Sequence, residues 1–197
     1  MQQWGSPQFD YGGGVVSDGA GKVYATGFVQ GLATGAQVGA KYAGSTGTSW
    51  GHMGDLVVAQ FDEVSGKQLW LYQSGTPGGD AGQHLEYQTG KAGGVLVFGA
   101  STGNMETGSA TSKYGAQDIV YLKVSQFGTL VSARQAGTAA ADAVGKVARN
   151  TAASTVYLPG WSDADWIGQS PDACVPQTSR EAFLARWCVQ GVGLPVQ

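Results

Sequence analysis

The chain carries little charge. Only 13% of its 197 residues are Asp, Glu, Lys or Arg, and the formal net charge is −3. The 11 Lys and Arg residues are scattered, so the sequence has no basic stripe of the kind that binds nucleic acid. No apolar run approaches the roughly 18 residues of a spanning helix, and we expect no membrane insertion. Because 42% of the residues are hydrophobic, the low charge does not indicate disorder.

Cysteine and histidine are also scarce. Cys174 and Cys188 either form a disulfide or remain two free thiols in a reducing compartment. No signal-peptide pattern follows Met1, so either the protein is not exported or the sequence begins after a leader. The compartment stays open between the cytoplasm and an extracellular, periplasmic or luminal location. With His52 and His84 as the only histidines, we expect no metal site, and we expect no cofactor.

Glycine is abundant, and one pattern occurs three times. The 33 glycines favour many turns and close backbone approaches. In each copy a Gly stands five positions before an Asp, and two apolar runs follow. The copies cover approximately residues 1–71, 72–133 and 134–197, and their Gly–Asp pairs are Gly5 and Asp10, Gly75 and Asp80, and Gly137 and Asp142. Such a repeat indicates a single domain, 1–197, built from similar stacked units.

Each copy is expected to form four short antiparallel strands. The apolar runs are rich in Val, Tyr, Phe and Leu, they are bounded by Gly, Asp and Ser, and no stretch has a sustained helical period. The third strand of each copy is almost continuously apolar, which is typical of a sheet covered on both faces. We expect strands at 14–17, 22–28, 55–61 and 67–73, at 83–87, 94–100, 118–124 and 129–135, and at 144–149, 154–160, 181–187 and 192–197.

A repeated four-stranded meander covered on both faces is typical of the blades of a β-propeller. The first strand of each copy is rich in small residues, which suits a crowded position close to a propeller axis, so we place that strand innermost. Pro159 lies where a central strand needs an amide donor, so we expect a bulge or a break beside it.

The amino-acid sequence of the repeat resembles that of a known family. In the first copy, SDGAGKVYATG (17–27) is followed by DLVVAQF (55–61) and GKQLW (66–70). This order resembles the bacterial-type β-propeller repeat (SBBP-like), whose usual segments are Asp-Gly-Asn-Val-Tyr-Val-Thr-Gly, Asp-Ala-Phe-Val-Ala-Lys-Tyr and Gly-Leu-Trp. The second copy has Val131 in place of the closing Trp. The resemblance covers nearly the whole chain. It implies an all-β fold of three four-stranded antiparallel blades, and it implies no shared active site.

Three blades do not make a closed ring, because closed propellers have about four to eight. We therefore expect an incomplete ring whose two outer faces expose Leu56, Val58, Phe183 and Trp187, an aggregation hazard unless they are covered. Further blades of a longer chain, a second copy giving six blades, or other proteins would cover them. A flattened prism of three sheets would need no partner.

Long connections between the second and third strands are the candidate contact surface. They span 29–54, 101–117 and 161–180, and loops longer than about 12 residues are usually functional or disordered. Aromatic residues and Met are favoured at contact surfaces. The candidates are Trp50, Met53, Tyr114, Trp161 and Trp166. Alternatively, these side chains fold back and cap the sheets.

Three other patterns point only weakly to chemistry. Residues 47–51 fit the G-x-S-x-G motif of serine hydrolases, but they lie in a Gly/Ser/Thr-rich insertion without the strand and helix which that motif needs. Asp163, Asp165 and Asp172 lack a twelve-residue calcium-loop signature, and a solvated turn is the simpler interpretation. The repeated aspartates of the Gly–Asp pairs are expected to hold an Asx turn at the entry to each first strand, the alternative being a ring of carboxylates lining a channel.

These features favour a non-enzymatic interaction or scaffold protein within a larger assembly. We expect other proteins, or a second copy, to complete the propeller. The alternative is a module that binds a ligand of carbohydrate type through loop tryptophans. An enzyme is the least favoured class, because no nucleophile, base and orienting group come together in the sequence, and no catalytic residue is expected.

Overall fold

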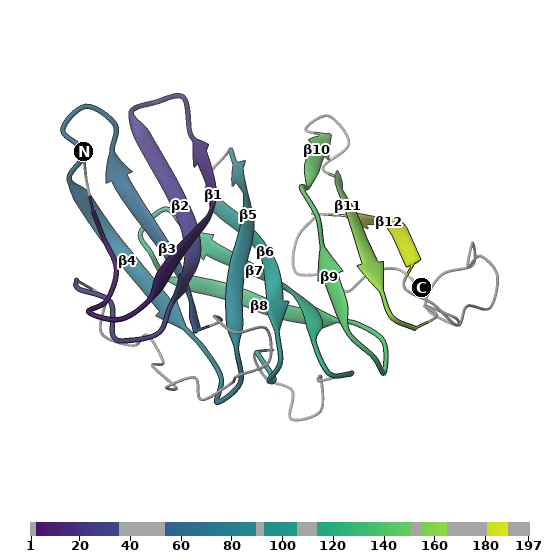
Figure 1. The fold of residues 1–197 in the computed structure, drawn as a ribbon. Coiled ribbons are helices and arrows are strands. Elements are labelled where there is room, and N and C mark those ends of the chain that lie inside the picture. Colours follow the sequence, from purple (N-terminus) through teal and green to yellow (C-terminus); the bar gives the residue numbers. More distant parts are fainter. Residues whose placement is uncertain are drawn as a thin grey trace.

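The protein is built from three four-stranded antiparallel sheets that follow one another along the chain (Figure 1). The structure is a computed structural model that describes residues 3–35, 54–89, 93–105, 114–150, 155–164 and 181–188, with side chains at 182–184 in the last range. The described residues contain no helix. The all-β expectation is therefore confirmed.

Each sheet corresponds to one copy of the sequence repeat. Sheet 1 contains β1 (Asp10–Ser17), β2 (Lys22–Val29), β3 (Asp55–Asp62) and β4 (Gln68–Ser74) in that order. Sheet 2 contains β5 (Asp80–Gln88), β6 (Gly94–Ser101), β7 (Asp118–Ser125) and β8 (Leu130–Ala136). Sheet 3 contains β9 (Asp142–Val144), β10 (Ala148–Asn150), β11 (Thr155–Ser162) and β12 (Glu181–Cys188). The strands of sheets 1 and 2 match the predicted ones, with β1 and β5 starting earlier than predicted. In sheet 3 the single strand expected at 144–149 is divided into β9 and β10, whereas β11 and β12 match the strands expected at 154–160 and 181–187. Residues 192–197 lie outside the described part of the chain.

The first strand of every sheet is irregular at the same place. In sheet 1 the register shifts between Gly12 and Gly14, and in sheet 2 it shifts between Gly82 and His84. In sheet 3 the irregularity is larger and divides the first strand into β9 and β10, which both pair with β11. This break lies opposite Pro159, as expected from the sequence, and the Gly145 N–H donates to the Pro159 carbonyl at 2.6 Å.

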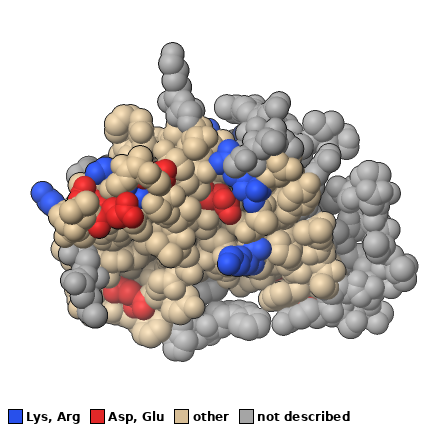
Figure 2. All heavy atoms as spheres, turned by 90° about the horizontal axis from the view of Figure 1, so that it is seen from above, with Lys and Arg blue, Asp and Glu red and all other residues tan. Residues whose placement is uncertain are grey.

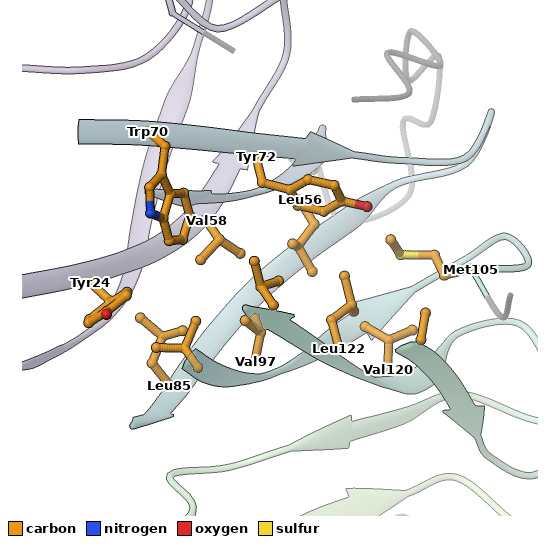
Figure 3. Packing of buried hydrophobic residues seen from close by; sticks show 13 residues of the cluster. Tyr24, Leu56, Val58, Trp70, Tyr72, Leu85, Val97, Met105, Val120 and Leu122 are labelled. Carbon is orange, nitrogen blue, oxygen red and sulfur yellow. The ribbon is translucent and has the colours of Figure 1, made fainter. Parts of the chain in front are cut away.

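The first apolar core lies between sheets 1 and 2. Figure 3 shows Tyr24, Leu56, Val58 and Trp70 of sheet 1 facing the side chains of sheet 2. From sheet 2 this core receives mainly aliphatic side chains, among them Leu85, Val95, Val97, Val120 and Leu122. The Trp70 indole N–H also donates to the Gln126 carbonyl at 3.0 Å, which ties sheet 1 to the turn between β7 and β8.

The expectation that Leu56 and Val58 are exposed is wrong. Both side chains are completely buried, because the face of β3 that carries them packs on sheet 2. Phe183 is also placed differently from the expectation. It is half-buried and packs on the second core, which lies between sheets 2 and 3 and is formed mainly by Leu96, Phe98, Ile119, Tyr121, Val144, Val147, Val156 and Leu158.

The outer face of sheet 1 is covered as well. Val57, Ala59 and Leu71 point away from sheet 2 and have no exposed surface. Trp4 packs against this cluster, with its ring centroid 6.1 Å from that of Phe61. The expectation of two open outer faces therefore fails at this end of the stack.

Sheets 1 and 2 approach each other closely through their first strands. A Cβ added at Gly13 of β1 would lie 2.2 Å from the Gly82 carbonyl oxygen and 3.0 Å from the Gln83 Cα of β5. Backbone atoms cannot retreat as a flexible side chain can, so this contact requires glycine. Gly12 in the same strand differs, because a Cβ added there would meet no atom within 4 Å.

This contrast predicts a difference between two neighbouring substitutions. We expect Gly13→Ala to lower the free energy of unfolding by about 1–3 kcal/mol, because it overpacks the contact between the two strands. Gly12→Ala should leave it within about 0.5 kcal/mol of the wild-type value. Urea unfolding followed by circular dichroism measures both variants, and equal midpoints would show that the approach of β1 to β5 is not a tight constraint.

Candidate interaction surface

The structure describes only some of the candidate contact residues. Tyr114 is 46% exposed, and its backbone N–H donates to Asp118 at 2.8 Å. Trp161 lies on β11 and is half-buried. Trp50, Met53, Trp166 and Cys174 lie outside the described residues, as do the side chains of Trp187 and Cys188. The choice between a disulfide and two free thiols therefore stays open.

The three sheets stack in one repeated manner, which allows equivalent positions to be compared. Val58, Tyr121 and Leu184 each pair with the residue just before the glycine in the second strand of their sheet. Val58 is buried by sheet 2, and Tyr121 belongs to the core between sheets 2 and 3. Leu184 is 70% exposed, because no further sheet of the described chain follows sheet 3.

The outer face of sheet 3 is thus an open apolar surface. Leu184 lies next to Tyr157, which is 36% exposed, and Pro159 is its direct strand partner. Ala182 is exposed on the same face. We call this set (Tyr157, Pro159, Ala182 and Leu184) the open face.

For β12 the sequence analysis predicts the wrong side chain to be exposed. Phe183, an exposed-face candidate, points toward sheet 2, while its neighbour Leu184 points outward. A continuously apolar strand gives no signal of which side chains face inward. The available signal was the comparison of copies, since Leu184 aligns with Val58 and Tyr121 when the third strands are superposed from their first residues, Asp55, Asp118 and Glu181.

A second exposed patch lies at the start of β1. Phe9 is 49% exposed and Tyr11 is 58% exposed, and both rings contact the buried ring of Phe28, with centroid distances of 6.0 Å and 5.7 Å. The Tyr11 and Phe28 rings are stacked. The sequence analysis does not predict this patch, because its candidates are aromatic residues of the long loops, whereas Phe9 and Tyr11 lie at the start of β1.

The repeated aspartates attach each sheet to the preceding segment of chain. Asp80 accepts the backbone N–H of Thr76 at 2.5 Å, and Asp142 accepts that of Thr138 at 2.6 Å. Asp10 accepts the N–H of Ser6 at 2.8 Å. Their local role is confirmed, but the donor lies four residues upstream, so the arrangement is not the expected Asx turn. Asp80 and Asp142 are completely buried and cannot line a solvent channel.

Each junction between sheets brings two aspartates together. The Asp80 N–H donates to the Gly54 carbonyl at 2.7 Å, which places Asp80 beside Asp55 at the start of β3. The Asp142 N–H donates to the Gln117 carbonyl at the same distance, which places Asp142 beside Asp118. All four aspartates are completely buried. Burial raises the pKa of Asp80 to about 7, with a smaller contribution from Asp55, and burial likewise raises the pKa of Asp142.

A glutamine holds the third-strand aspartate of each junction. The Gln73 amide donates to Asp55 at 2.9 Å and to the Gly31 carbonyl at 3.0 Å, and its carbonyl accepts the Ala33 N–H at 2.9 Å. Gln135 repeats these contacts with Asp118 and with the backbone of Gly103 and Met105. Gln73 and Gln135 each stand two positions before a repeated glycine, a signal that the sequence contained.

His84 is the one histidine among the described residues. His84 lies on β5, where burial and the nearby charge of Lys146 lower its pKa. The described ranges contain no group of three His, Cys, Asp or Glu residues placed to hold a metal ion. Nor does the described part of the chain contain a helix long and apolar enough to cross a membrane. Charge is sparse on the face seen in Figure 2, where small groups of acidic side chains lie next to basic ones.

Comparison with known proteins gives no relative for this chain. No protein-family model matches it, and no curated protein matches it. Its function must therefore be inferred from its own geometry, and the resemblance to the bacterial-type propeller repeat stays a prediction.

The glutamine contacts predict a specific loss of stability. We expect Gln73→Leu to lower the free energy of unfolding by about 3 kcal/mol, because it leaves the buried Asp55 carboxylate and two backbone groups without this partner. Gln68→Leu on the same strand is the matched control, since among the described residues its amide makes one long hydrogen bond, to the Thr34 carbonyl at 3.5 Å. Urea unfolding of both variants tests this, and a similar small loss in each would contradict the role of Gln73.

Proposed function

We propose that the chain is a non-enzymatic protein-interaction module, an arc of three β-propeller blades whose open face docks another protein. The repeated stacking of the sheets and the irregularity at one shared position of each first strand support the assignment of the sheets as blades. The resemblance of the repeat to the bacterial-type propeller family supports it as well.

The exposure of Leu184 is the observation that carries this proposal. Side chains at the two equivalent positions are buried by the sheet that follows, and Leu184 is 70% exposed. An apolar surface on the flat face of a sheet favours association over solvation. A partner that covers Leu184 and Tyr157 would complete the series of cores that runs through the stack.

The cores inside the stack indicate the chemistry of this partner. Phe98 and Tyr121 of sheet 2 pack against three side chains of sheet 3, Val144, Val156 and Leu158. Sheet 1 likewise presents aromatic side chains to an aliphatic face of sheet 2. The open face, with Tyr157 and Leu184, therefore fits a β-sheet surface rich in valine.

A different protein is a better partner than a second copy of this chain. A six-bladed ring of two copies needs the outer face of sheet 1 to receive the open face of the other copy. Val57, Ala59 and Leu71 on that outer face are already buried, and Trp4 packs against them. Ring closure would require displacement of Trp4, at the cost of exposing that cluster to water.

Photo-crosslinking tests this proposal. With p-benzoylphenylalanine in place of Leu184, we expect one discrete protein adduct in the cells that make this chain, identified by mass spectrometry as a β-sheet protein. The matched control carries the same group in place of Val64, which is 95% exposed in the turn after β3. Adducts of equal yield at both positions, or an adduct with the chain itself alone, would contradict a specific partner at the open face.

The exposed rings of Phe9 and Tyr11 favour a second candidate function. Aromatic faces stack on the apolar faces of sugars, and these two rings are held in place by Phe28. This patch therefore suits the ligand-binding alternative better than Trp161, which is half-buried.

A glycan array tests the second candidate. If it is right, we expect a subset of glycans to bind and Tyr11→Ala to reduce that binding at least tenfold, about 1.4 kcal/mol. Phe127→Ala, at another exposed aromatic residue, should leave binding unchanged. Absence of binding across the array would leave the interaction module as the remaining function.

A further inference from the structure

The two junctions between sheets share one arrangement of buried acids. In each junction the first-strand aspartate donates its N–H, at 2.7 Å, to the carbonyl just before the third-strand aspartate of the preceding sheet. The pairs are Asp55 with Asp80 and Asp118 with Asp142, and none of the four side chains is exposed. These contacts bring two ionisable carboxyl groups together where water does not screen them.

Gly137 shows how closely the second pair converges. A Cβ added at Gly137 would lie 2.3 Å from Asp118 Oδ1 and 2.8 Å from Asp142 Oδ2. Asp118 Oδ1 is buried and receives no hydrogen bond from the described residues. Two buried carboxyl groups directed to the same point repel each other when both are ionised, so a proton held by the pair is favoured.

We propose that each junction is a proton-linked joint: the buried Asp pair retains a proton while the sheets are packed, and its release to solvent as the pH rises through neutrality loosens the two sheets. This inference is independent of the proposed docking function. It rests on the arrangement that both junctions share.

The electrostatic environment supports this joint. Asp80 accepts hydrogen bonds from Thr76 and from the Ser101 hydroxyl, and these favour its ionised form. Burial outweighs them and raises its pKa to about 7, and Asp55 adds to the rise. At the second junction, hydrogen bonds from Thr138 and Ser162 likewise oppose the effect of burial, and Asp118 adds to the rise in the pKa of Asp142.

The sign of the pH dependence follows from these shifts. An aspartate whose pKa is raised on folding contributes stability that is complete below its unfolded value, near 3.8, and is lost as the pH rises through the folded value. For Asp80 the window extends from about pH 4 to about pH 7. The ratio of folded to unfolded protein should fall roughly 100-fold between about pH 5 and about pH 8 through this group alone.

Two other ionisable groups on β5 also have shifted pKa values. Burial lowers the pKa of His84, with Lys146 nearby, so His84 opposes the trend and favours folding as the pH rises. Burial raises the pKa of Glu86, which Arg149 partly offsets, so Glu86 acts in the same direction as Asp80. The measured quantity must therefore be the difference between the wild type and a variant that lacks only the carboxyl group of the joint.

Urea unfolding of the full chain at about pH 5 and about pH 8 is the test. We expect the wild type to lose roughly 100-fold more of its folding equilibrium constant over this interval than Asp80→Asn does. Asp10→Asn is the matched control, because Asp10 is anchored in the same way by Ser6 and none of the described sheets precedes it to supply a second carboxylate. It should keep the wild-type pH dependence.

Two results would overturn the proposal. A pH dependence for Asp80→Asn equal to that of the wild type would overturn the proposal. So would a loss of pH dependence in Asp10→Asn as large as that in Asp80→Asn, since the effect would then not require a pair. If Asp80→Asn does not fold, Asp142→Asn provides the same comparison at the second junction, with the same outcomes decisive.

Discussion

The hydrogen bond from the first-strand aspartate to the end of the previous sheet is the constraint on which the stack depends. It joins Asp80 to the Gly54 carbonyl and Asp142 to the Gln117 carbonyl, at 2.7 Å in both junctions. Because this bond fixes where each first strand begins, it also fixes which face of the new sheet meets the previous one. The close approach of Gly13 to Gly82, and the aromatic-on-aliphatic cores, follow from that placement.

The sequence predicted the strands well because their signals are local. Each strand is a run of Val, Tyr, Phe or Leu between turn residues, and the repeat supplied three versions of it. Pro159 also predicted the broken first strand of sheet 3, since a missing amide donor has a direct structural effect.

The face of the sheet to which each side chain points, and the pairing of residues across a junction, could not be predicted in the same way. The register shift in each first strand changes the alternation of side chains, and a strand that is apolar throughout, such as β3, does not reveal its orientation. For this reason the sequence analysis predicts Leu56 and Val58 to be exposed, whereas both side chains lie in the core. The pairing of Asp55 with Asp80 depends on residues 25 positions apart meeting across a junction, which no local pattern encodes.

Because the outer face of sheet 1 is buried, the two ends of the stack differ. One end is finished by the chain's own Trp4, and the other presents Tyr157 and Leu184 to solvent. Self-association through like ends is limited to pairs, because two capped ends would then point outward and leave nothing for a third molecule to join. In the described part of the chain the apolar sheet face therefore lies at one end of the stack, and a contact made through that face alone would close after two molecules.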